Sequence, residues 1–285
     1  MGRLLLGLVL AGGLLVATGP VQTAAGGPGH VVAAAPEAKP DKCGRKPAPK
    51  PNGRQWQCTL AENFTGKKLN PKVWMVFRDK QPANKSTSCR KASNVVLKQG
   101  QLRLKVRKNK GRRCPYTSAS ISTHQRWSQK FGRFEARIKV QRTKERGLQE
   151  SFWLWPDDRV ESNVKWPAAG EIDIVETYSQ YPNLAVPFLH YTHNDNGGPK
   201  PGLNTAWDCK ARRGRWHLYT LLWGPERIEI RVDRKRCLLN TSGDRAFKKK
   251  YIIALTAALG LGQNRVNSDT PLPATMTVDY VKVWR

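Results

Sequence analysis

The chain of 285 residues carries 50 Lys and Arg against 21 Asp and Glu, a formal net charge of +29. The length allows one large domain of about 240 residues after processing, which is enough for a sizeable core and requires no second domain. A surface this basic attracts polyanions such as nucleic acid, anionic wall polymers or sulfated glycans, yet the sequence has no recognition helix, zinc finger or nucleic-acid-binding strand motif. The charge therefore indicates either wall retention or a solvated basic face that keeps an exported protein soluble.

The first 25 residues predict a secretory signal peptide. Arg3 precedes the apolar run 4–10, and small residues follow at 23–25. Glycines and a proline interrupt the apolar stretch, so we expect no permanent membrane span, although an uncleaved anchor stays open. Residues 26–52 are rich in Ala, Pro, Gly and Lys without apolar periodicity, which predicts a flexible linker before a folded domain at 53–285. We expect a secreted protein, extracellular or associated with the cell wall.

Six cysteines follow the signal segment, with no C-x-x-C pair and no nearby His at metal-binding spacing. An even count in an exported protein favours disulfides. Six cysteines permit fifteen pairings, and the sequence alone does not distinguish them. Pairing of neighbours along the chain gives our prediction of Cys43–Cys58, Cys89–Cys114 and Cys209–Cys237.

From Gln57 onward, short runs of strand-forming residues are separated by turn residues. Apolar residues alternate with charged ones in 102–107, 134–140, 228–232 and 276–284, which is the period of a half-buried strand. Residues 251–261 are mostly apolar and precede a Gly-rich turn, so we expect a buried strand there and not a helix. Strands without long helical segments between them predict an antiparallel sandwich.

Residues 170–177, Gly-Glu-Ile-Asp-Ile-Val-Glu-Thr, are the part of the sequence most suited to chemistry. On a strand, Glu171 and Asp173 point to one face while Ile172 and Ile174 point into the core. Strict alternation would bury Glu176, but one extra residue in a β-bulge would return it to the acidic face. We therefore expect three carboxylates in a row on one face.

Carboxylates two residues apart on a strand lie about 6–7 Å from one another, and like charges that close raise each other's pKa. Retaining glycosidases use such a pair, with one charged carboxylate as nucleophile and one protonated acid as proton donor. A solvated acidic face and a calcium site built from oxygen ligands are the alternatives that the motif leaves open. The ten Trp residues add a weak indication of sugar binding, because indoles stack on sugar rings.

Segment 166–176, Trp-Pro-Ala-Ala-Gly-Glu-Ile-Asp-Ile-Val-Glu, resembles the signature of glycoside hydrolase family 16, in the bulged form of its laminarinase-like members. The resemblance covers about residues 55–285 in the family's order, and is closest to secreted actinobacterial members with cysteines at similar places. Besides the signature, it is carried by residues 63–74, 100–104, 116–140, 147–156 and 278–284.

The resemblance implies an all-β fold, a jelly-roll sandwich of two antiparallel sheets in which the inner sheet bends into a concave substrate cleft. It also implies roles for the acids. Glu171 matches the nucleophile, Glu176 matches the general acid/base, and Asp173 matches the carboxylate that orients the nucleophile and helps to set the protonation states.

Aromatic residues near the acids are candidates for binding the substrate. Trp153, Trp155 and Trp166 are expected to stack on glucose-like rings, and Tyr178 and His190 to hydrogen-bond sugar hydroxyls. Ordinary packing is the alternative for Trp155 and Tyr178, and a packed strand histidine is the alternative for His190.

The family also suggests a structural cation. Glu62 and Asp279, near the first and last strands, resemble positions that hold an ion in many members, so a structural calcium is expected there while the reaction itself requires no cofactor.

Three functions remain open from the sequence. The first is a retaining endo-β-glucan hydrolase acting on internal β-1,3 bonds, with mixed β-1,3/1,4 glucans as a second substrate class. The second is a non-catalytic glycan-binding module, which the three intact acids disfavour. The third is a polyanion-binding surface protein that holds anionic cell-wall polymers through its charge.

Overall fold

Alternating apolar and polar residues form strands throughout the described part of the computed structural model, which comprises residues 42–44, 47–50, 52–82, 88–160, 164–191, 198 and 200–285. The predicted signal peptide and most of the predicted linker lie outside these residues. At the C-terminal end of the linker, Cys43 is buried and disulfide-bonded to Cys58. Among the described residues, no helix is long and apolar enough to cross a membrane.

Helical structure in the described ranges is confined to 3-10 turns at Ala92–Asn94, Arg245–Phe247 and Gly262–Asn264. The strands are β1 (Cys58–Glu62), β2 (Met75–Val76), β3 (Ser88–Arg90), β4 (Val95–Leu97), β5 (Leu102–Lys108), β6 (Tyr116–Ser122), β7 (Gly132–Lys139), β8 (Leu148–Pro156), β9 (Glu171–Tyr178), β10 (Val186–His190), β11 (Trp216–Trp223), β12 (Ile228–Val232), β13 (Lys235–Asn240), β14 (Tyr251–Leu259) and β15 (Ala274–Trp284).

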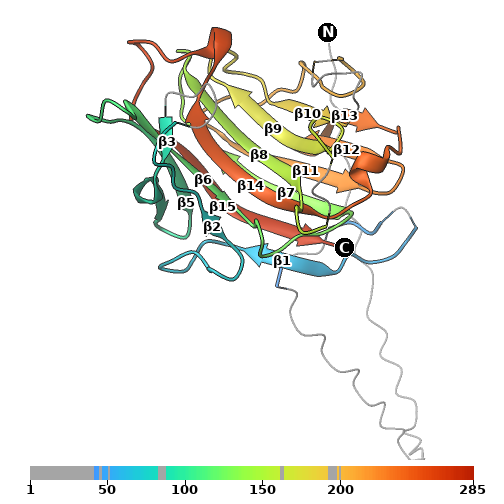
Figure 1. The fold of residues 1–285 in the computed structure, drawn as a ribbon. Coiled ribbons are helices and arrows are strands. Elements are labelled where there is room, and N and C mark those ends of the chain that lie inside the picture. Colours follow the sequence, from blue (N-terminus) through green and yellow to red (C-terminus); the bar gives the residue numbers. More distant parts are fainter. Residues whose placement is uncertain are drawn as a thin grey trace, which may run out of the picture. The chain divides into compact units, whose positions relative to one another are not determined.

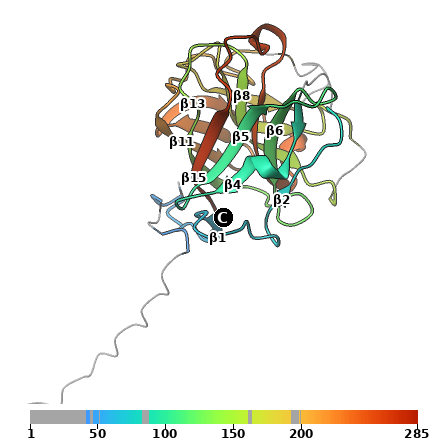
Figure 2. The ribbon, with the colours of Figure 1, turned by 90° about the vertical axis from the view of Figure 1, so that its left-hand side faces the viewer.

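These strands pair in the order β10-β9-β8-β14-β6-β5-β15-β7-β11-β12-β13, with β1 on β15, β2 and β3 on β6, and β4 on β5. Figure 1 shows that the path folds over itself, so that β9, β8, β14 and β6 form one curved layer in front of β7, β11 and β12. Figure 2 shows the side where β6, β5 and β15 join the layers. We call β10-β9-β8-β14-β6-β2 the cleft sheet, and β4-β5-β15-β7-β11-β12-β13 the back sheet.

The core lies between the two sheets and is built from the inward-facing residues of both. Ile172 of β9 and Leu221 of β11 are completely buried in it. Trp223 of the back sheet meets Tyr251 of the cleft sheet edge to face, with ring centroids 5.2 Å apart. Its indole also donates to the Phe247 carbonyl at 3.1 Å. The contact satisfies a buried donor while two large rings fill the space between the layers.

The described structure confirms most of the strand predictions. The apolar run 251–261 is the buried strand β14, which ends at Leu259, and the last strand begins at Ala274. The sheets are antiparallel apart from one pair, since β3 runs parallel to β6. All three predicted disulfides are present, and none of the six cysteines is free.

Candidate active site

The bulge expected in the acidic strand is present in β9. Trp153 of β8 pairs with Asp173, whereas its neighbour Phe152 pairs with Val175, so Ile174 is the extra residue. The register with β10 shifts over the same stretch. Ile174 and Val175 are both buried, and Glu176 is half-buried on the other side of the strand. The bulge thus brings Glu176 to the face of Glu171 and Asp173.

Gly170 fixes the point at which the acidic strand begins. Its φ of +90° lies in the region that favours glycine, and a Cβ atom built there would overlap the Tyr251 hydroxyl. That hydroxyl is held in place because it donates to the Ala246 carbonyl at 2.9 Å. The sequence Gly-Glu at 170–171 therefore sets the position of the first carboxylate.

Each of the outer carboxylates accepts hydrogen bonds from neighbouring side chains. Trp166 Nε1 donates to Glu171 Oε2 at 2.7 Å. Gln149 Nε2 donates to Glu176 Oε1 and the Tyr178 hydroxyl donates to Glu176 Oε2, both at 2.7 Å. These bonds fix both carboxylates in orientation, and the partners come from β8, β9 and the loop before β9.

Asp173 lies between the outer acids beside a histidine. His190 Nε2 is 3.5 Å from Asp173 Oδ2, and the ligand atoms of Glu171, Asp173 and His190 lie within 4.8 Å of one another. The imidazole stacks on Phe188 with ring centroids 4.4 Å apart, and Trp166 covers it at 5.0 Å. His190, predicted as a sugar-contacting residue, is thus part of the acidic cluster.

The site raises the pKa of its acids. Burial, and then the charge of Asp173, raise the pKa of Glu171 well above its usual value. Burial, and then the charge of Glu176, raise the pKa of Asp173 in the same way. Burial and the neighbouring Glu176 carboxylate also raise the pKa of Tyr178, which stays a hydrogen-bond donor. Since a proton on either Glu171 or Asp173 lowers the repulsion on the other, the two carboxyl groups do not titrate independently.

The concave face of the cleft sheet continues from the acids across β8 and β14. A hollow of about 640 Å³ is lined by Trp153 and Trp155 of β8, by Ala254 and Thr256 of β14, and by residues of β2 and β6. Trp153 donates to Thr256 Oγ1 at 3.1 Å and meets Trp155 edge to face at 6.1 Å. Both predicted tryptophans therefore line the cleft beside the acids.

Two aromatic residues on the other side of Glu176 were not predicted. Trp207 stacks parallel to Tyr178 with ring centroids 6.2 Å apart, and Tyr181 meets Trp207 edge to face at 5.6 Å. Trp207 remains 40% exposed and Tyr181 36%. Trp207 lies in an irregular segment in which apolar and polar residues do not alternate. The only sequence signal for a sugar-binding role was therefore that the residue is a tryptophan.

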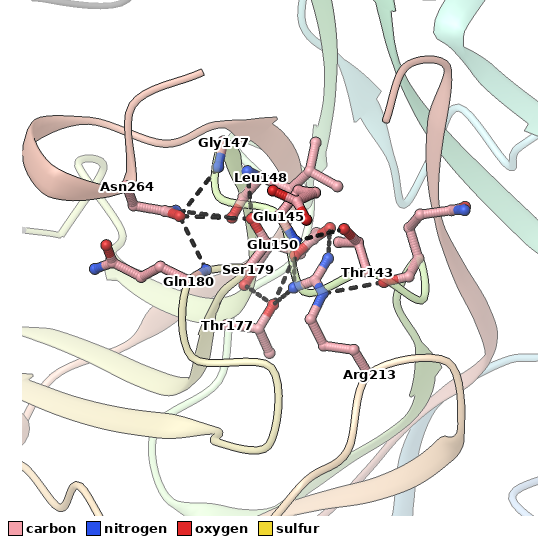
Figure 3. Close-up of polar contacts among 11 residues, drawn as sticks. Thr143, Glu145, Gly147, Leu148, Glu150, Thr177, Ser179, Gln180, Arg213 and Asn264 are labelled. Carbon is pink, nitrogen blue, oxygen red and sulfur yellow. Dashed lines mark hydrogen bonds and ion pairs between the residues drawn. The ribbon is translucent and has the colours of Figure 1, made fainter. Parts of the chain in front are cut away.

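Beneath Glu176, a buried network joins β8 to β9, and Figure 3 shows its members converging from separate elements. Arg213 donates to Glu150 Oε1 at 2.7 Å and to Oε2 at 2.8 Å, and Thr177 Oγ1 donates to the same Glu150 Oε2 at 2.7 Å. Asn264 accepts from the Gly147 N–H and donates to the Leu148 carbonyl. Glu150 and Thr177 directly adjoin Gln149 and Glu176 in sequence, so the network fixes the pairing of the strands that carry them.

The predicted calcium ligands are engaged with protein groups. Glu62 accepts from the Phe64 N–H at 2.8 Å and from Trp74 Nε1 at 3.1 Å. Asp279 accepts from Arg137 at 2.8 Å. Neither belongs to the cluster of Glu171, Asp173 and His190, which is the one grouping of at least three such ligand side chains within the described residues. The calcium ion stays a prediction.

Comparisons with known proteins agree with this geometry. The model of the family described as "Glycosyl hydrolases family 16" matches residues 83–282. Glucan endo-1,3-beta-glucosidase A1 of Niallia circulans is 26% identical over 218 residues, which cover 67% of this chain and 31% of that relative. A beta-glucanase of Rhodothermus marinus is 30% identical over 185 residues, which cover 60% of this chain and 63% of the relative. The chain thus spans less than two thirds of the length of either relative.

The fold comparison extends the match to most of the chain. The solved endo-beta-1,3-glucanase of Pyrococcus furiosus superimposes with a TM-score of 0.70, over 82% of this chain and 95% of that one, at 24% identity. This shows a common fold and confirms the predicted all-β jelly-roll sandwich.

Proposed function

The chain belongs to glycosyl hydrolase family 16, and we propose that it is a retaining endo-β-glucan hydrolase that cleaves internal β-1,3 bonds, with mixed β-1,3/1,4 glucans as a second substrate class. The observation that carries the proposal is the bulged strand β9, which presents Glu171, Asp173 and Glu176 on one face of the cleft sheet, next to a hollow lined by Trp153 and Trp155. The names of the relatives support a β-glucan as substrate.

In the first step, Glu171 attacks the anomeric carbon and forms a glycosyl ester, while the bond to the leaving oxygen breaks. Protonated Glu176 gives its proton to that oxygen. In the second step, Glu176 takes a proton from water, and the resulting hydroxide displaces Glu171 from the anomeric carbon. The two displacements together retain the configuration of the sugar.

The nucleophile has to be charged although its surroundings raise its pKa. We infer that Asp173 holds a proton, so that Glu171 has a neutral neighbour when it ionises, and that the Trp166 N–H at 2.7 Å stabilises the anion. Asp173 is then a positioning residue that also sets the charge of Glu171.

The general acid/base is held by two donors, Gln149 and Tyr178, which accounts for its fixed orientation. Trp153 and Trp155 offer indole surfaces to the sugars on one side of the acids, and Trp207 offers one on the other side. Platforms on both sides suit an endo-acting enzyme, since an internal bond needs sugars bound in both directions from the scissile bond.

A panel of polysaccharides tests the proposal. The purified chain is incubated with β-1,3-glucan, mixed-linkage β-1,3/1,4-glucan and β-1,4-glucan, and the products are separated by size. We expect oligosaccharides from the first two. The variant Glu171→Gln keeps its size and polarity, so it should lose roughly three orders of magnitude in turnover or more while still binding the glucan.

The variant Glu176→Gln is the matched comparison. A substrate with a good leaving group needs little protonation, so its first step should be partly spared in this variant but not in Glu171→Gln. Binding without cleavage by the wild-type chain on every glucan would support a glycan-binding module instead. Secretion and association with the cell wall are further proposals, supported by the three disulfides.

A further inference from the structure

The outer face of the back sheet, turned away from the core and from the cleft, carries rows of cations. In β5, Leu102 and Leu104 point into the core and are completely buried, whereas Arg103, Lys105 and Arg107 occupy the alternate positions on the outer face. β5 lies beside β15 (Figure 2), so these cations border the outer face of that strand.

The register across β15 gives this face a floor of small residues. Lys105 pairs with Thr275, and Arg103 pairs with Thr277, which pairs in turn with Lys139 of β7. Paired residues of neighbouring strands share a face, so Thr277 lies between cations on both sides and Thr275 lies beside Lys105. A hollow of about 350 Å³ lies over Thr275, and its lining contains Lys105, Arg107 and Lys108 but no carboxylate.

A second hollow follows on the same face, toward the C-terminal end of β15. It measures about 690 Å³, and its lining includes Arg133, Arg231 and Lys282 together with Glu135. Lys282 pairs in register with Glu135, which accepts from Arg133 and from the Tyr280 hydroxyl. Glu135, the carboxylate of this hollow, is therefore already bonded to protein groups. The hollow adds net positive charge to the outer face of the back sheet.

Five cations in the two hollows and beside Thr277 form what we call the back-face strip, namely Arg103, Lys105, Arg107, Lys139 and Lys282. None of them forms an ion pair with a carboxylate of the described residues, and Arg103 donates to the neutral Gln99 side chain at 2.8 Å. Asp279 and Glu229, two other acids of this face, form ion pairs with arginines outside the strip. Asp279 pairs with Arg137, and Glu229 pairs with Arg227 and Arg231.

Cations on alternate residues of a strand repeat about every 7 Å, and cations two strands apart lie about 10 Å from one another. Their mutual repulsion disfavours the bare strip, and a ligand with regularly spaced negative charges relieves it. We propose that the back-face strip binds a linear anionic polysaccharide. The strip lies on the opposite side of the sandwich from the acids, so a neutral glucan and an anionic polymer can be bound at once.

Other polyanions fit the strip less well. Binding of single-stranded nucleic acid relies on exposed aromatic rings that stack on the bases. The most exposed aromatic side chains of the described residues, Trp166, Tyr181 and Trp207, lie outside the strip. The rings beside the strip, Trp216 and Tyr280, are half-buried and already lie against Lys139 and Lys282, at 5.0 and 4.5 Å. No large apolar side chain is exposed on β5, β7 or β15 either, so the strip offers nothing to insert into a lipid surface.

The test measures the dissociation constant of the full chain for polygalacturonate, which carries carboxylates, for dextran sulfate, and for neutral dextran, at several salt concentrations. The strip variant is Arg103→Gln with Lys105→Gln and Lys139→Gln. The control variant removes three cations elsewhere, with Lys80→Gln, Lys130→Gln and Lys210→Gln, so both variants have the same net charge.

We expect tight, salt-sensitive binding to at least one anionic polysaccharide and none to neutral dextran. The strip variant should bind about tenfold more weakly with a shallower salt dependence, while the control variant stays close to wild type. Both should hydrolyse β-glucan as the wild type does. The single variant Lys105→Gln should show a smaller loss in the same direction, which keeps the test valid if the triple variant folds poorly.

Equal losses in the strip and control variants would overturn the proposal in favour of diffuse attraction by net charge. Tighter binding to a single-stranded oligonucleotide of the same length and charge would overturn the choice of polysaccharide. The inference does not depend on hydrolysis, because the strip would bind its ligand even if the cleft cleaved nothing.

Discussion

The ion pair between Glu150 and Arg213 gives a stability prediction that can be worked from the structure. Arg213 is 1% exposed and Glu150 3%, and two bonds of 2.7 and 2.8 Å join them. Replacing Glu150 with Gln leaves a guanidinium in the interior without an opposing charge. Such a loss destabilises a fold by about 3–5 kcal/mol, and solvent screening hardly reduces it at this depth. For a domain of about 240 residues the melting temperature should fall by roughly 6–20 °C.

The same substitution should also affect catalysis in the molecules that remain folded. Glu150 accepts from Thr177, and these two residues adjoin Gln149 and Glu176. Loosening of the strand pairing there should move the general acid/base, so Glu150→Gln should lower turnover at 20 °C, where the protein is still folded. Urea unfolding followed by tryptophan fluorescence gives the free energy of unfolding, and initial rates on β-glucan give the turnover.

Glu226→Gln is the matched control, since it makes the same chemical change in the pair with Lys248, whose side chains are 71% and 40% exposed. An exposed pair contributes about 0–1 kcal/mol, so this variant should unfold nearly as the wild type does. If Glu150→Gln were as mild as Glu226→Gln, the buried network would not hold β8 and β9 together, and the reasoning would be refuted.

Three further predictions concern charge, metal and thiols. Because the pKa of Asp173 is raised in the folded state, its contribution to stability is present at low pH and is lost as the pH rises toward that pKa. The variant Asp173→Asn does not titrate, so its melting temperature relative to wild type should increase from pH 4 to pH 7. A difference in melting temperature that does not change with pH would contradict the raised pKa. A calcium ion held by Glu62 and Asp279 predicts a lower melting temperature after treatment with a chelator, and an unchanged value would exclude it. Labelling of the unreduced protein with a thiol reagent should modify none of the six cysteines, in agreement with the three disulfides, and several labelled thiols would contradict them.

Local patterns predicted much of this molecule. The alternation of apolar and charged residues at 102–107 was enough to predict β5. The acidic stretch was enough to predict the bulge, because without it Glu176 would be buried at a large cost in free energy. Long-range pairings were not predictable in this way. The bond from Arg213 to Glu150 spans 63 positions, and neither residue lies in a pattern that points to the other.

The surroundings of the acids show the same division. Residue types and spacing identified Glu171, Asp173 and Glu176, but not Gln149 as a donor to Glu176 or Trp207 as the ring beside Tyr178. Those contacts depend on how β8 and the irregular segment around Trp207 are placed around β9, and the periodicity of the sequence does not predict that placement. The closely spaced acids predicted a raised pKa for Glu171, but burial, which is the largest cause, follows only from the folded chain.

The anomeric form of the first product tests the central claim most directly. Proton NMR recorded in the first minutes after adding the chain to a soluble β-glucan follows the new reducing ends before they mutarotate. Double displacement through Glu171 predicts that the β-anomer appears first and the α-anomer only later. If the α-anomer appeared first, the glycosidic bond would be cleaved by a single displacement, and Glu171 would not be the nucleophile.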